Sequence, residues 1–402
     1  MIERTNPRAA EAVVAQLPAP DADARQHSLQ LVSLIRDEIA AAGGRIPFDR
    51  YMELALYAPG LGYYAAGARK FGAAGDFVTA PEISPLFARC LARQCREVLD
   101  GLPGGTILEV GAGSGILAAD LLLELERLDC LPARYLILDL SPELQQRQRQ
   151  TLSQHAPHLL ERVEWLTAFP ESAFCGLVIA NELLDAMPVH RFRLSAGTLL
   201  EQFVGCNGER FELIWAAPES PAFAQHLAAA LGQLGANDDY ESEVNLRAGP
   251  WLVSLAHCLE RGAVLLIDYG HSRAEYYHPA RSRGTLMCHY RHRAHPDPLV
   301  YPGLQDITAH VDFTAIAEAA LAAGFRVAGY TTQAFFLMGS GLDRLVAESD
   351  PDEAAAHLAL VQGVRRLTLP TEMGERFKVL GLTKGWESPL SGFAMRDLRD
   401  RL

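Results

Sequence analysis

A short apolar run from Thr106 to Val110 leads directly into glycines at positions 111, 113 and 115, and a helical stretch begins near Ile116. Glycine carries no side chain, so it lets the chain turn sharply and lets a ligand touch the backbone. A strand, a glycine-rich turn and a helix in this order are typical of open α/β sheets, which bind ligands at the carboxyl ends of their strands. The unit therefore predicts an α/β fold with a ligand at this turn.

Further apolar runs of strand length follow the same pattern over residues 86–270. Each run ends at a polar residue or a glycine, and helical stretches such as 117–128 and 142–154 lie between them. Strands that alternate with helices indicate an open, mostly parallel, twisted sheet covered on both faces. The expected strands are 106–110, 135–138, 163–166, 177–180 and 263–267.

Other parts of the chain differ from this core in composition. Residues 51–85 are rich in glycine, proline and aromatic residues, and residues 271–310 are dense in His, Arg, Tyr and Pro. Such densities of turn-forming residues mark shaped loop regions. Helical spacing returns over 342–369, and 377–382 has the pattern of a last strand. We expect five segments: a flexible N-terminal segment (1–27), a helical and loop cap (28–85), the α/β core (86–270), a substrate-binding cap (271–345), and a C-terminal helix and strand that complete the core (346–402).

Charge and cysteine content narrow the class of protein. The chain has 36 basic and 49 acidic residues and a formal net charge of -13, which disfavours a protein that binds nucleic acid through its phosphates. Seven scattered cysteines without a C-x-x-C pair predict neither a disulfide framework nor a zinc knuckle. No apolar stretch is long enough to span a membrane, and the N-terminus lacks the pattern of an export or transit signal. We expect a cytoplasmic bacterial protein whose oligomeric state is left open.

The spacing of the glycines helps to identify the ligand. In dinucleotide-binding turns the third glycine falls one residue later, as G-x-G-x-x-G, because the pyrophosphate rests on the helix N-terminus. Here the pattern is G-x-G-x-G, and Glu109 precedes it. Asp139 ends the next strand, where a carboxylate can accept hydrogen bonds from both ribose hydroxyls. These features indicate a nucleoside cofactor; the alternative is a structural turn with a surface aspartate.

Polar side chains follow the strand at 177–180 and are candidates for the chemistry. Asn181 and Glu182 come directly after the strand, and Asp185 lies three residues further on. Two carboxylates at a strand end could pair with a guanidinium and orient one of its nitrogens. The alternative is that Asn181 and Asp185 cap a helix. Asp76, in the loop 75–82, is expected to close over the cofactor, with a plain turn as the alternative.

A histidine-rich segment supplies the remaining candidates. His289, Tyr290 and His310 lie in or near loops of the expected substrate cap, and His271 follows the strand that ends at Asp268. We expect no metal, because prolines interrupt the segment and no cysteine pair accompanies the histidines. Hydrogen bonds to substrate or to neighbouring groups are the preferred interpretation for these side chains.

Five ordered motifs between about 45 and 340 resemble those of the MidA-like methyltransferases. The G-x-G-x-G turn resembles motif I of the class I methyltransferases. The resemblance implies a Rossmann-like class I methyltransferase fold with additional substrate-binding cap segments, S-adenosyl-L-methionine as cofactor, and a protein arginine as acceptor. One departure is that Asp139 stands where relatives often carry Glu, which changes the reach of the side chain and leaves its role intact. The motifs are 75–85, 108–115, 181–189, 266–270 and 306–312.

Together, these arguments assign roles to thirteen residues. An arginine-bearing protein, such as a respiratory-complex subunit, is the expected partner. The alternatives are a small-molecule methyltransferase on the same fold, a non-catalytic assembly factor that binds the cofactor, and, more distantly, an NAD enzyme. The expected cofactor-binding residues are Asp76, Glu109, Gly111, Gly113, Gly115, Asp139 and Asn181, the catalytic residues are Glu182, Asp185 and His271, and the substrate-binding residues are His289, Tyr290 and His310.

Overall fold

The apolar runs of the sequence form the central sheet. The computed structural model describes residues 3–4, 17–66, 79–231, 239–350 and 353–402. The strands of this sheet are β3 (Thr106–Val110), β4 (Arg134–Leu138), β5 (Val163–Leu166), β6 (Phe174–Asn181), β11 (Leu259–His271), β15 (Val311–Asp312), β16 (Arg326–Thr332) and β17 (Phe377–Lys384). Their order is β16-β17-β11-β6-β3-β4-β5, with β15 paired to β11. Strands β11, β6, β3, β4 and β5 run parallel, so the predicted open, mostly parallel α/β sheet is confirmed.

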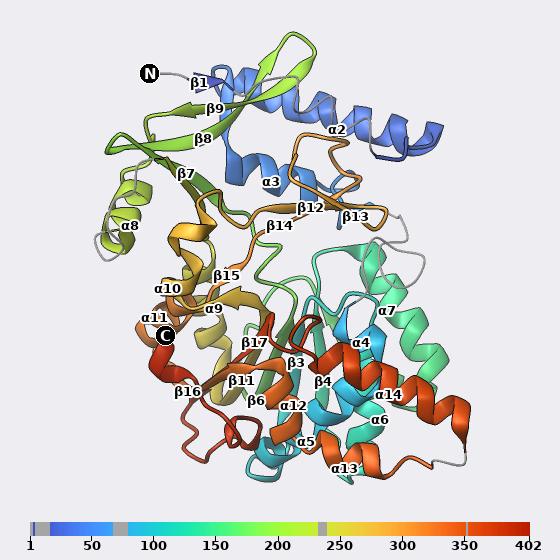
Figure 1. Cartoon of the computed structure of the whole chain (residues 1–402). Helices are drawn as coiled ribbons and strands as arrows, with labels where there is room; N and C mark the ends of the chain where they lie inside the picture. Colours follow the sequence, from blue (N-terminus) through green and yellow to red (C-terminus); the bar gives the residue numbers. More distant parts are fainter. Residues whose placement is uncertain (1–2, 5–16, 67–78, 232–238, 351–352) are drawn as a thin grey trace.

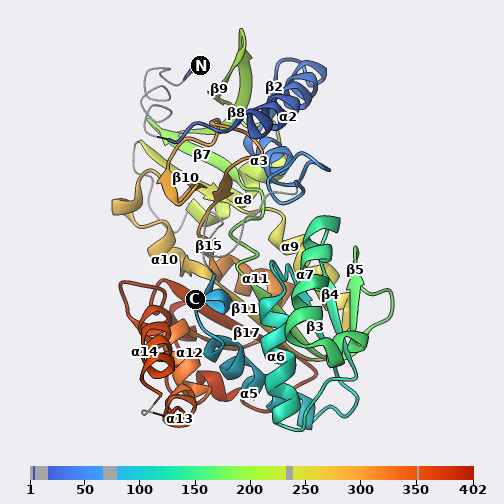
Figure 2. The same ribbon diagram turned by 90° about the vertical axis from the view of Figure 1, so that its right-hand side faces the viewer.

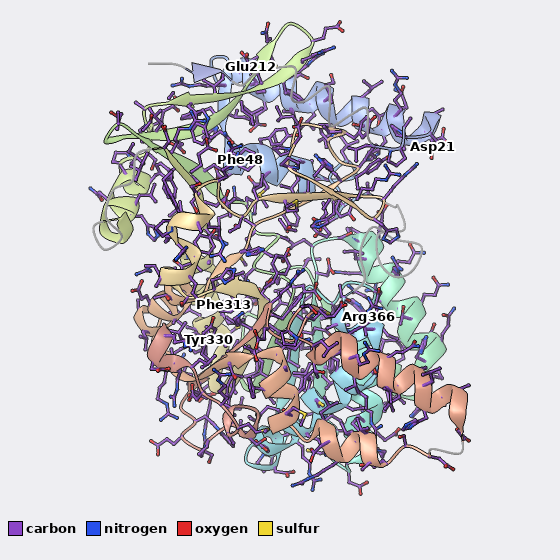
Figure 3. All side chains as sticks on the ribbon, viewed as in Figure 1. Asp21, Phe48, Glu212, Phe313, Tyr330 and Arg366 are labelled. Atoms are coloured by element: carbon purple, nitrogen blue, oxygen red, sulfur yellow. The ribbon has the colours of Figure 1, made fainter. Side chains whose placement is uncertain are left out.

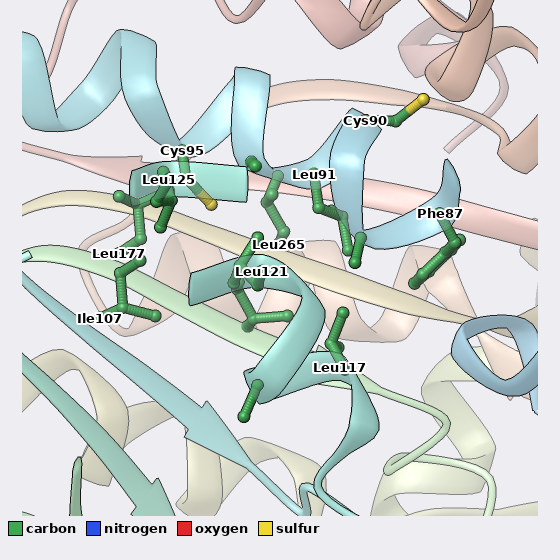
Figure 4. Packing of buried hydrophobic residues seen from close by; sticks show 14 of the residues in the cluster. Phe87, Cys90, Leu91, Cys95, Ile107, Leu117, Leu121, Leu125, Leu177 and Leu265 are labelled. Carbon is green, nitrogen blue, oxygen red and sulfur yellow. The ribbon is translucent and has the colours of Figure 1, made fainter. Parts of the chain in front are cut away.

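Helices cover both faces of this sheet. Successive residues of a strand point to opposite faces, and Ile107 and Leu108 accordingly belong to different buried clusters. Helices α5 (Leu86–Asp100) and α6 (Ile116–Arg127) pack on the Ile107 face, as Figure 4 shows for Leu91 and Leu121. Helices α9 (Ala248–Cys258) and α11 (Phe313–Ala322) contribute to the cluster that contains Leu108.

A second, antiparallel sheet, here called the cap sheet, lies above the parallel sheet in Figure 1. It consists of β1 (Glu3–Arg4), β2 (Arg45–Pro47), β7 (His190–Ser195), β8 (Thr198–Asn207), β9 (Arg210–Ala216) and β10 (Tyr240–Val244). Helix α3 (Phe48–Tyr57) packs against it, and α2 (Ala22–Ala41) contacts β2 and β8. Figure 2 shows the same two-layer arrangement after a quarter turn.

The cap sheet corrects the expectation that 86–270 forms one α/β core. Strands β7, β8, β9 and β10 are not part of the parallel sheet, and β9 and β8 pair with β1 and β2 from earlier in the chain. The local reason is a two-residue hairpin between β7 and β8, in which Ala196 and Gly197 both have positive φ, 46° and 74°. Such turns join antiparallel strands and are incompatible with a parallel crossover.

Two further segments differ from the expected boundaries. Helix α2 begins at Ala22, inside the segment 1–27, because Asp21 caps it by accepting a hydrogen bond from the Ala24 N–H at 2.9 Å. The expected helix over 342–369 is divided into α13 (Leu342–Ala347) and α14 (Ala354–Thr368). The last strand, β17, lies antiparallel between β11 and β16 and so completes the central sheet.

The remaining elements are a small sheet and five further α-helices of the described residues. A small sheet of β12 (Met287–Tyr290), β13 (Arg293–His295) and β14 (Asp306–Thr308) lies between the cap sheet and the parallel sheet in Figure 1. No helix in the described ranges is both long and apolar enough to span a membrane. The other helices are α4 (Ala80–Ile83), α7 (Pro142–His155), α8 (Pro221–Leu231), α10 (Arg273–Tyr276) and α12 (Gln333–Gly339).

Candidate active site

A cavity of about 1190 Å³ opens between the carboxyl ends of the parallel strands and the cap segments. Its walls come from elements far apart in the sequence, including α3, the ends of β3, β4, β6 and β11, the small sheet, and α14. Asp76 lies outside the described residues, and Gly115 and Tyr290 do not contribute to the walls that the described residues form. The predicted site residues that line the cavity are Glu109, Gly111, Gly113, Asp139, Asn181, Glu182, Asp185, His271, His289 and His310.

The glycine turn requires glycine for steric reasons. Gly111, Gly113 and Gly115 have φ values of 71°, 53° and 82°, a region that residues with a side chain seldom adopt. A Cβ on Gly111 would lie 2.9 Å from Leu183 Cδ1, and one on Gly115 would lie 2.8 Å from Gln148 Cα. Gly111 and Gly113 consequently present bare backbone to the cavity, while Gly115 allows α7 to approach the start of α6.

Asp139 is held in place by two hydrogen bonds at the carboxyl end of β4. The backbone N–H of Ser141 donates to Oδ1 at 2.9 Å, and the Gln148 side-chain amide donates to Oδ2 at 2.7 Å. These contacts orient the carboxyl group before any ligand binds, and a carboxylate oxygen can accept more than one hydrogen bond. This geometry suits a group that accepts hydrogen bonds from ribose hydroxyls.

Gln148, which was not predicted as a site residue, connects three parts of this wall. Its side chain is fully buried and contacts Asp139, the carbonyl oxygen of Gly113 at 3.3 Å, and Trp165 Nε1 at 3.1 Å. Nothing in the local pattern of a polar helix marks one glutamine among several in α7. Its importance depends on the packing of α7 against the glycine turn.

Replacing Asp139 with alanine is expected to weaken S-adenosylmethionine binding by about 10- to 100-fold, because a charged hydrogen-bond acceptor is lost. Titration calorimetry measures this change. Glu143→Ala is the matched control, since Glu143 is a nearby exposed acid in the first turn of α7. An Asp139→Ala protein that is folded and binds the cofactor as tightly as the control would contradict the assigned position of the ribose.

Glu109 lies at the floor of the cavity, almost completely buried in β3. Tyr135 Oη donates to its Oε2 at 2.6 Å. Burial raises the pKa of Glu109 to about 7, and the Tyr135 hydrogen bond opposes this rise. A buried carboxyl group beside the turn favours a ligand with hydrogen-bond donors or positive charge at this position.

Glu182 occupies a strained position directly after β6. Its φ is 52°, and its backbone N–H donates to the carbonyl oxygen of Ile267 at 2.8 Å. The Ala80 N–H and the Asn181 amide both donate to Oε1, at 3.3 Å and 3.2 Å. Burial, and then repulsion from Asp185, raise the pKa of Glu182 to about 8. Strain of this kind persists where the surroundings hold a side chain in a functional position.

Asp185 lies beside Glu182, and we call these two residues the acid pair. Tyr269 Oη donates a short hydrogen bond to Asp185 Oδ2, whereas the buried Oδ1 has no hydrogen-bond partner in the described structure. Burial raises the pKa of Asp185. No helix begins among the residues that follow, 186–189, so the helix-cap alternative for Asn181 and Asp185 is not supported.

Asp268 and Tyr269 position the acid pair and were not predicted as site residues. Asp268 Oδ2 accepts hydrogen bonds from the backbone N–H groups of Leu184 and Asp185, at 2.8 Å and 3.2 Å. Burial and the neighbouring carboxylates raise the pKa of Asp268. The position of Asp268 near the end of a buried parallel strand was the sequence signal that could have identified it as a site residue, because β11 ends at the same sheet edge as β6.

The predicted histidines occupy different environments. His271 and His310 lie together with ring centroids 5.3 Å apart, and burial lowers the pKa of His271 to about 4 and that of His310 to about 3. Both are therefore neutral at pH 7. His289 lines the cavity, whereas Tyr290, its neighbour in β12, points to the other face of the strand and packs on Tyr301. Among the described residues, no group of three or more His, Cys, Asp or Glu side chains could hold a metal ion.

These walls fit the cofactor implied by the fold. Bare backbone at Gly111 and Gly113, an oriented carboxyl group at Asp139, and a buried Asn181 Oδ1 that accepts no hydrogen bond from the described residues would hold a polar nucleoside with an amino-acid moiety. Cofactor contacts by individual residues remain predictions.

Comparisons with known proteins agree with this cofactor. A family model described as S-adenosyl-L-methionine-dependent methyltransferase matches residues 90–331. The mitochondrial protein arginine methyltransferase NDUFAF7 of Mus musculus is 30% identical, covering 84% of this chain and 81% of the relative. The NDUFAF7 homolog of Drosophila melanogaster is 29% identical, covering 88% and 85%.

A solved structure extends the similarity to almost the whole chain. A crystal structure of a superfamily member from Burkholderia thailandensis, bound to S-adenosyl-homocysteine, is 46% identical and has a TM-score of 0.92. It covers 96% of this chain and 100% of that chain. The resemblance to MidA-like methyltransferases is thereby confirmed, as is the expected S-adenosylmethionine cofactor.

The expected cytoplasmic location requires correction. The curated relatives of Drosophila melanogaster, Mus musculus and Homo sapiens all carry mitochondrial names. The lack of a recognisable leader pattern therefore does not support a cytoplasmic location.

The family match, the bound product in the solved relative and the site geometry agree on the enzyme class. The chain belongs to the MidA-like methyltransferase family and is an S-adenosyl-L-methionine-dependent methyltransferase.

Proposed function

We propose that this enzyme transfers a methyl group to a guanidinium nitrogen of an arginine side chain in a protein. The observation that carries the proposal is the acid pair, Glu182 and Asp185, which is buried at the cavity wall and has an acceptor oxygen, Asp185 Oδ1, without a partner among the described residues. The relatives named protein arginine methyltransferases, at 28 to 30% identity, support the same acceptor.

A guanidinium matches this arrangement better than other cations. It remains protonated under all physiological conditions and presents several N–H groups in one plane, which two carboxylates can accept together. Burial raises the pKa of both members of the acid pair, so a bound cation would offset the cost of ionising them. An ammonium group would meet the charge requirement without the planar geometry.

The chain's own residues would orient the acceptor and receive a proton. Bound S-adenosylmethionine supplies an electrophilic methyl group. Tyr269 fixes Asp185 through its hydrogen bond, and Asn181 together with the Ala80 N–H fixes Glu182. With both carboxylates held, one guanidinium nitrogen would face the methyl group, and Glu182 would accept the proton that this nitrogen loses.

The other predicted residues have roles that follow from their positions. We propose that Gly111, Gly113 and Asp139 bind the cofactor and that His289 and His310, from the cap segments, contact the substrate. His271 is neutral and packed against His310, which suits a positioning role better than direct proton transfer. The segment 271–345 supplies much of the substrate side of the cavity. A respiratory-complex subunit is the first partner to test, because of the family resemblance.

The pH dependence follows from the pKa of Glu182. The carboxylate form binds the guanidinium and accepts the proton, and this form increases as the pH rises through about 8. We therefore expect kcat/KM to rise between pH 6 and pH 9, since arginine itself does not titrate in this range. Steady-state rates over this range measure the profile. The groups facing Glu182 are Asp185 and Glu82, both acidic, so a rate that falls with increasing pH would contradict the proposed base.

The proposal is tested by following a labelled methyl group. The purified enzyme is incubated with methyl-labelled S-adenosylmethionine and an extract of cells that lack it, and acid then separates protein from small molecules. Label in the precipitated protein is expected. Label that remains in the soluble fraction, and depends on the enzyme, would favour the small-molecule alternative. The absence of any transfer, with the cofactor bound, would favour the assembly-factor alternative.

A further inference from the structure

A group of arginines on the substrate side of the cavity has no assigned partner. Arg281, Arg366 and Arg376 line the cavity, and we call them the cationic wall. Among the described residues, none of the three side chains forms an ion pair with a carboxylate, although Glu372, which is exposed, lines the same region. Figure 3 labels Arg366, which is exposed, near the carboxyl end of α14. Arg366 and Arg376 are exposed, whereas Arg281 is partly buried, so the charge of Arg281 is the least screened by solvent.

Arg281 is the member of this wall with a buried hydrogen-bond donor that lacks an acceptor among the described residues. Its Nη1 atom is buried and has no hydrogen-bond acceptor in the described parts of the chain. The Nδ1 atom of His310, another cavity residue, is also buried without a partner there. A buried guanidinium nitrogen without an acceptor is costly, and such atoms are usually satisfied by a ligand or water.

Arg281 lies close enough to both cavity histidines to influence them. After burial, the positive charge of Arg281 is the second cause of the lowered pKa of His271, and it also contributes to that of His310. Both imidazoles are therefore neutral and can donate or accept a hydrogen bond without adding charge. Arg281 thus provides positive charge at this end of the cavity.

The cationic wall and the acid pair line the same cavity. Tyr269 contacts Asp185 through its hydroxyl group and His310 through its ring, with centroids 5.2 Å apart. A ligand that reaches both ends therefore needs a cation at one end and an anion at the other. Two side chains on the same face of an extended peptide lie about 7 Å apart, so one short peptide segment can present a cation and an anion to the same cavity.

We propose that Arg281 binds the carboxylate of an aspartate or glutamate that lies within two residues of the methylated arginine. The inference rests on the proposed arginine acceptor and adds the sequence preference of the same site. An arginine can bind a carboxylate through two parallel hydrogen bonds, which gives directional recognition. Arg281 could also bind the methionyl carboxylate of the cofactor, and the experiment separates these two sources of the carboxylate.

The experiment measures peptide binding to the full-length protein saturated with S-adenosylhomocysteine. Four peptides carry arginine or its neutral isostere citrulline, and aspartate or asparagine two residues after it. A second set of four places the aspartate or asparagine two residues before it. Calorimetry gives each Kd. We expect the aspartate peptide to bind about tenfold more tightly than the asparagine peptide. Arg281→Gln should abolish this preference, while Arg283→Gln, a change at an exposed neighbour, should retain it.

The outcomes decide between the sources of the carboxylate. Equal binding of the aspartate and asparagine peptides, or binding of neither, contradicts the inference. Loss of S-adenosylhomocysteine affinity in Arg281→Gln, with an unchanged melting temperature, assigns Arg281 to the cofactor and also contradicts it. Arg281→Lys keeps the charge, and we expect it to restore part of the preference. If citrulline and arginine peptides bind equally while the aspartate preference persists, the arginine acceptor fails and the carboxylate site stands.

Discussion

Replacing Gly113 with valine is expected to lower the affinity for S-adenosylmethionine by at least about 100-fold. Gly113 has a φ of 53°, which a β-branched residue adopts only at a cost of about 1–2 kcal/mol. The new side chain would also occupy the turn where bare backbone lines the cavity. Strain and steric exclusion therefore act together on cofactor binding. Titration calorimetry of the wild-type and variant proteins measures the change.

Gly197→Val is the matched control for backbone strain. Gly197 has a φ of 74° and lies in the hairpin between β7 and β8, where a Cβ would meet open space, with no atom beyond the adjacent residues within 4 Å. We expect this variant to melt at a lower temperature and to bind the cofactor with wild-type affinity. If both variants lose the same affinity, or Gly113→Val loses none, the glycine turn is not the cofactor site.

Replacing Glu182 with glutamine is expected to reduce kcat by about 100- to 1000-fold, because a proton acceptor and a charge partner are both lost. Cofactor affinity should change by less than about threefold, since the side chain is proposed to face the acceptor. The variant keeps the size of the side chain, so the backbone at this position need not move. Steady-state methylation rates and cofactor titration measure the two effects separately.

Stability provides a second readout for Glu182. Its pKa is raised to about 8 in the folded protein, so between the unfolded pKa and pH 8 the folded chain keeps a proton that the unfolded chain has released. The fold therefore loses stability as the pH rises through this range, and the full penalty is present above pH 8. Glutamine removes this penalty, and we expect the variant to melt no lower than the wild type at pH 8. Glu372→Gln, at an exposed acid that also lines the cavity, is the control and should retain activity. A fully active Glu182→Gln enzyme would exclude Glu182 from the reaction.

Local sequence patterns were sufficient to predict six of the eight strands of the central sheet, but not β15 and β16. The glycines that follow the run 106–110 lie at a strand end, and so does Glu182; the carboxyl edge of a parallel sheet collects functional groups. The apolar pattern of each strand reflects burial on both faces, so the strands could be recognised one at a time. The cap sheet was not predicted because the hairpin turn at 196–197 is a weaker sequence signal than the alternating strands and helices on either side of it.

Residues whose role depends on distant contacts could not be recognised. Tyr269 becomes important because its hydroxyl group reaches Asp185, 84 positions earlier in the chain. Gln148 acts through the packing of α7 on the glycine turn, and Arg281 through a buried Nη1 atom that finds no acceptor among the described residues. Tyr290 shows the opposite case, since a one-residue step along β12 turns it away from the cavity that His289 lines.

The identity of the methylated side chain is the most direct test of the account. Protein labelled by the wild-type enzyme is digested, and mass spectrometry locates the added methyl group. The account predicts methylated arginine, formed by the wild-type enzyme and by Glu372→Gln but not by Glu182→Gln. Methylation confined to lysine, histidine or a carboxyl group would contradict it, because the acid pair would then have no guanidinium to bind.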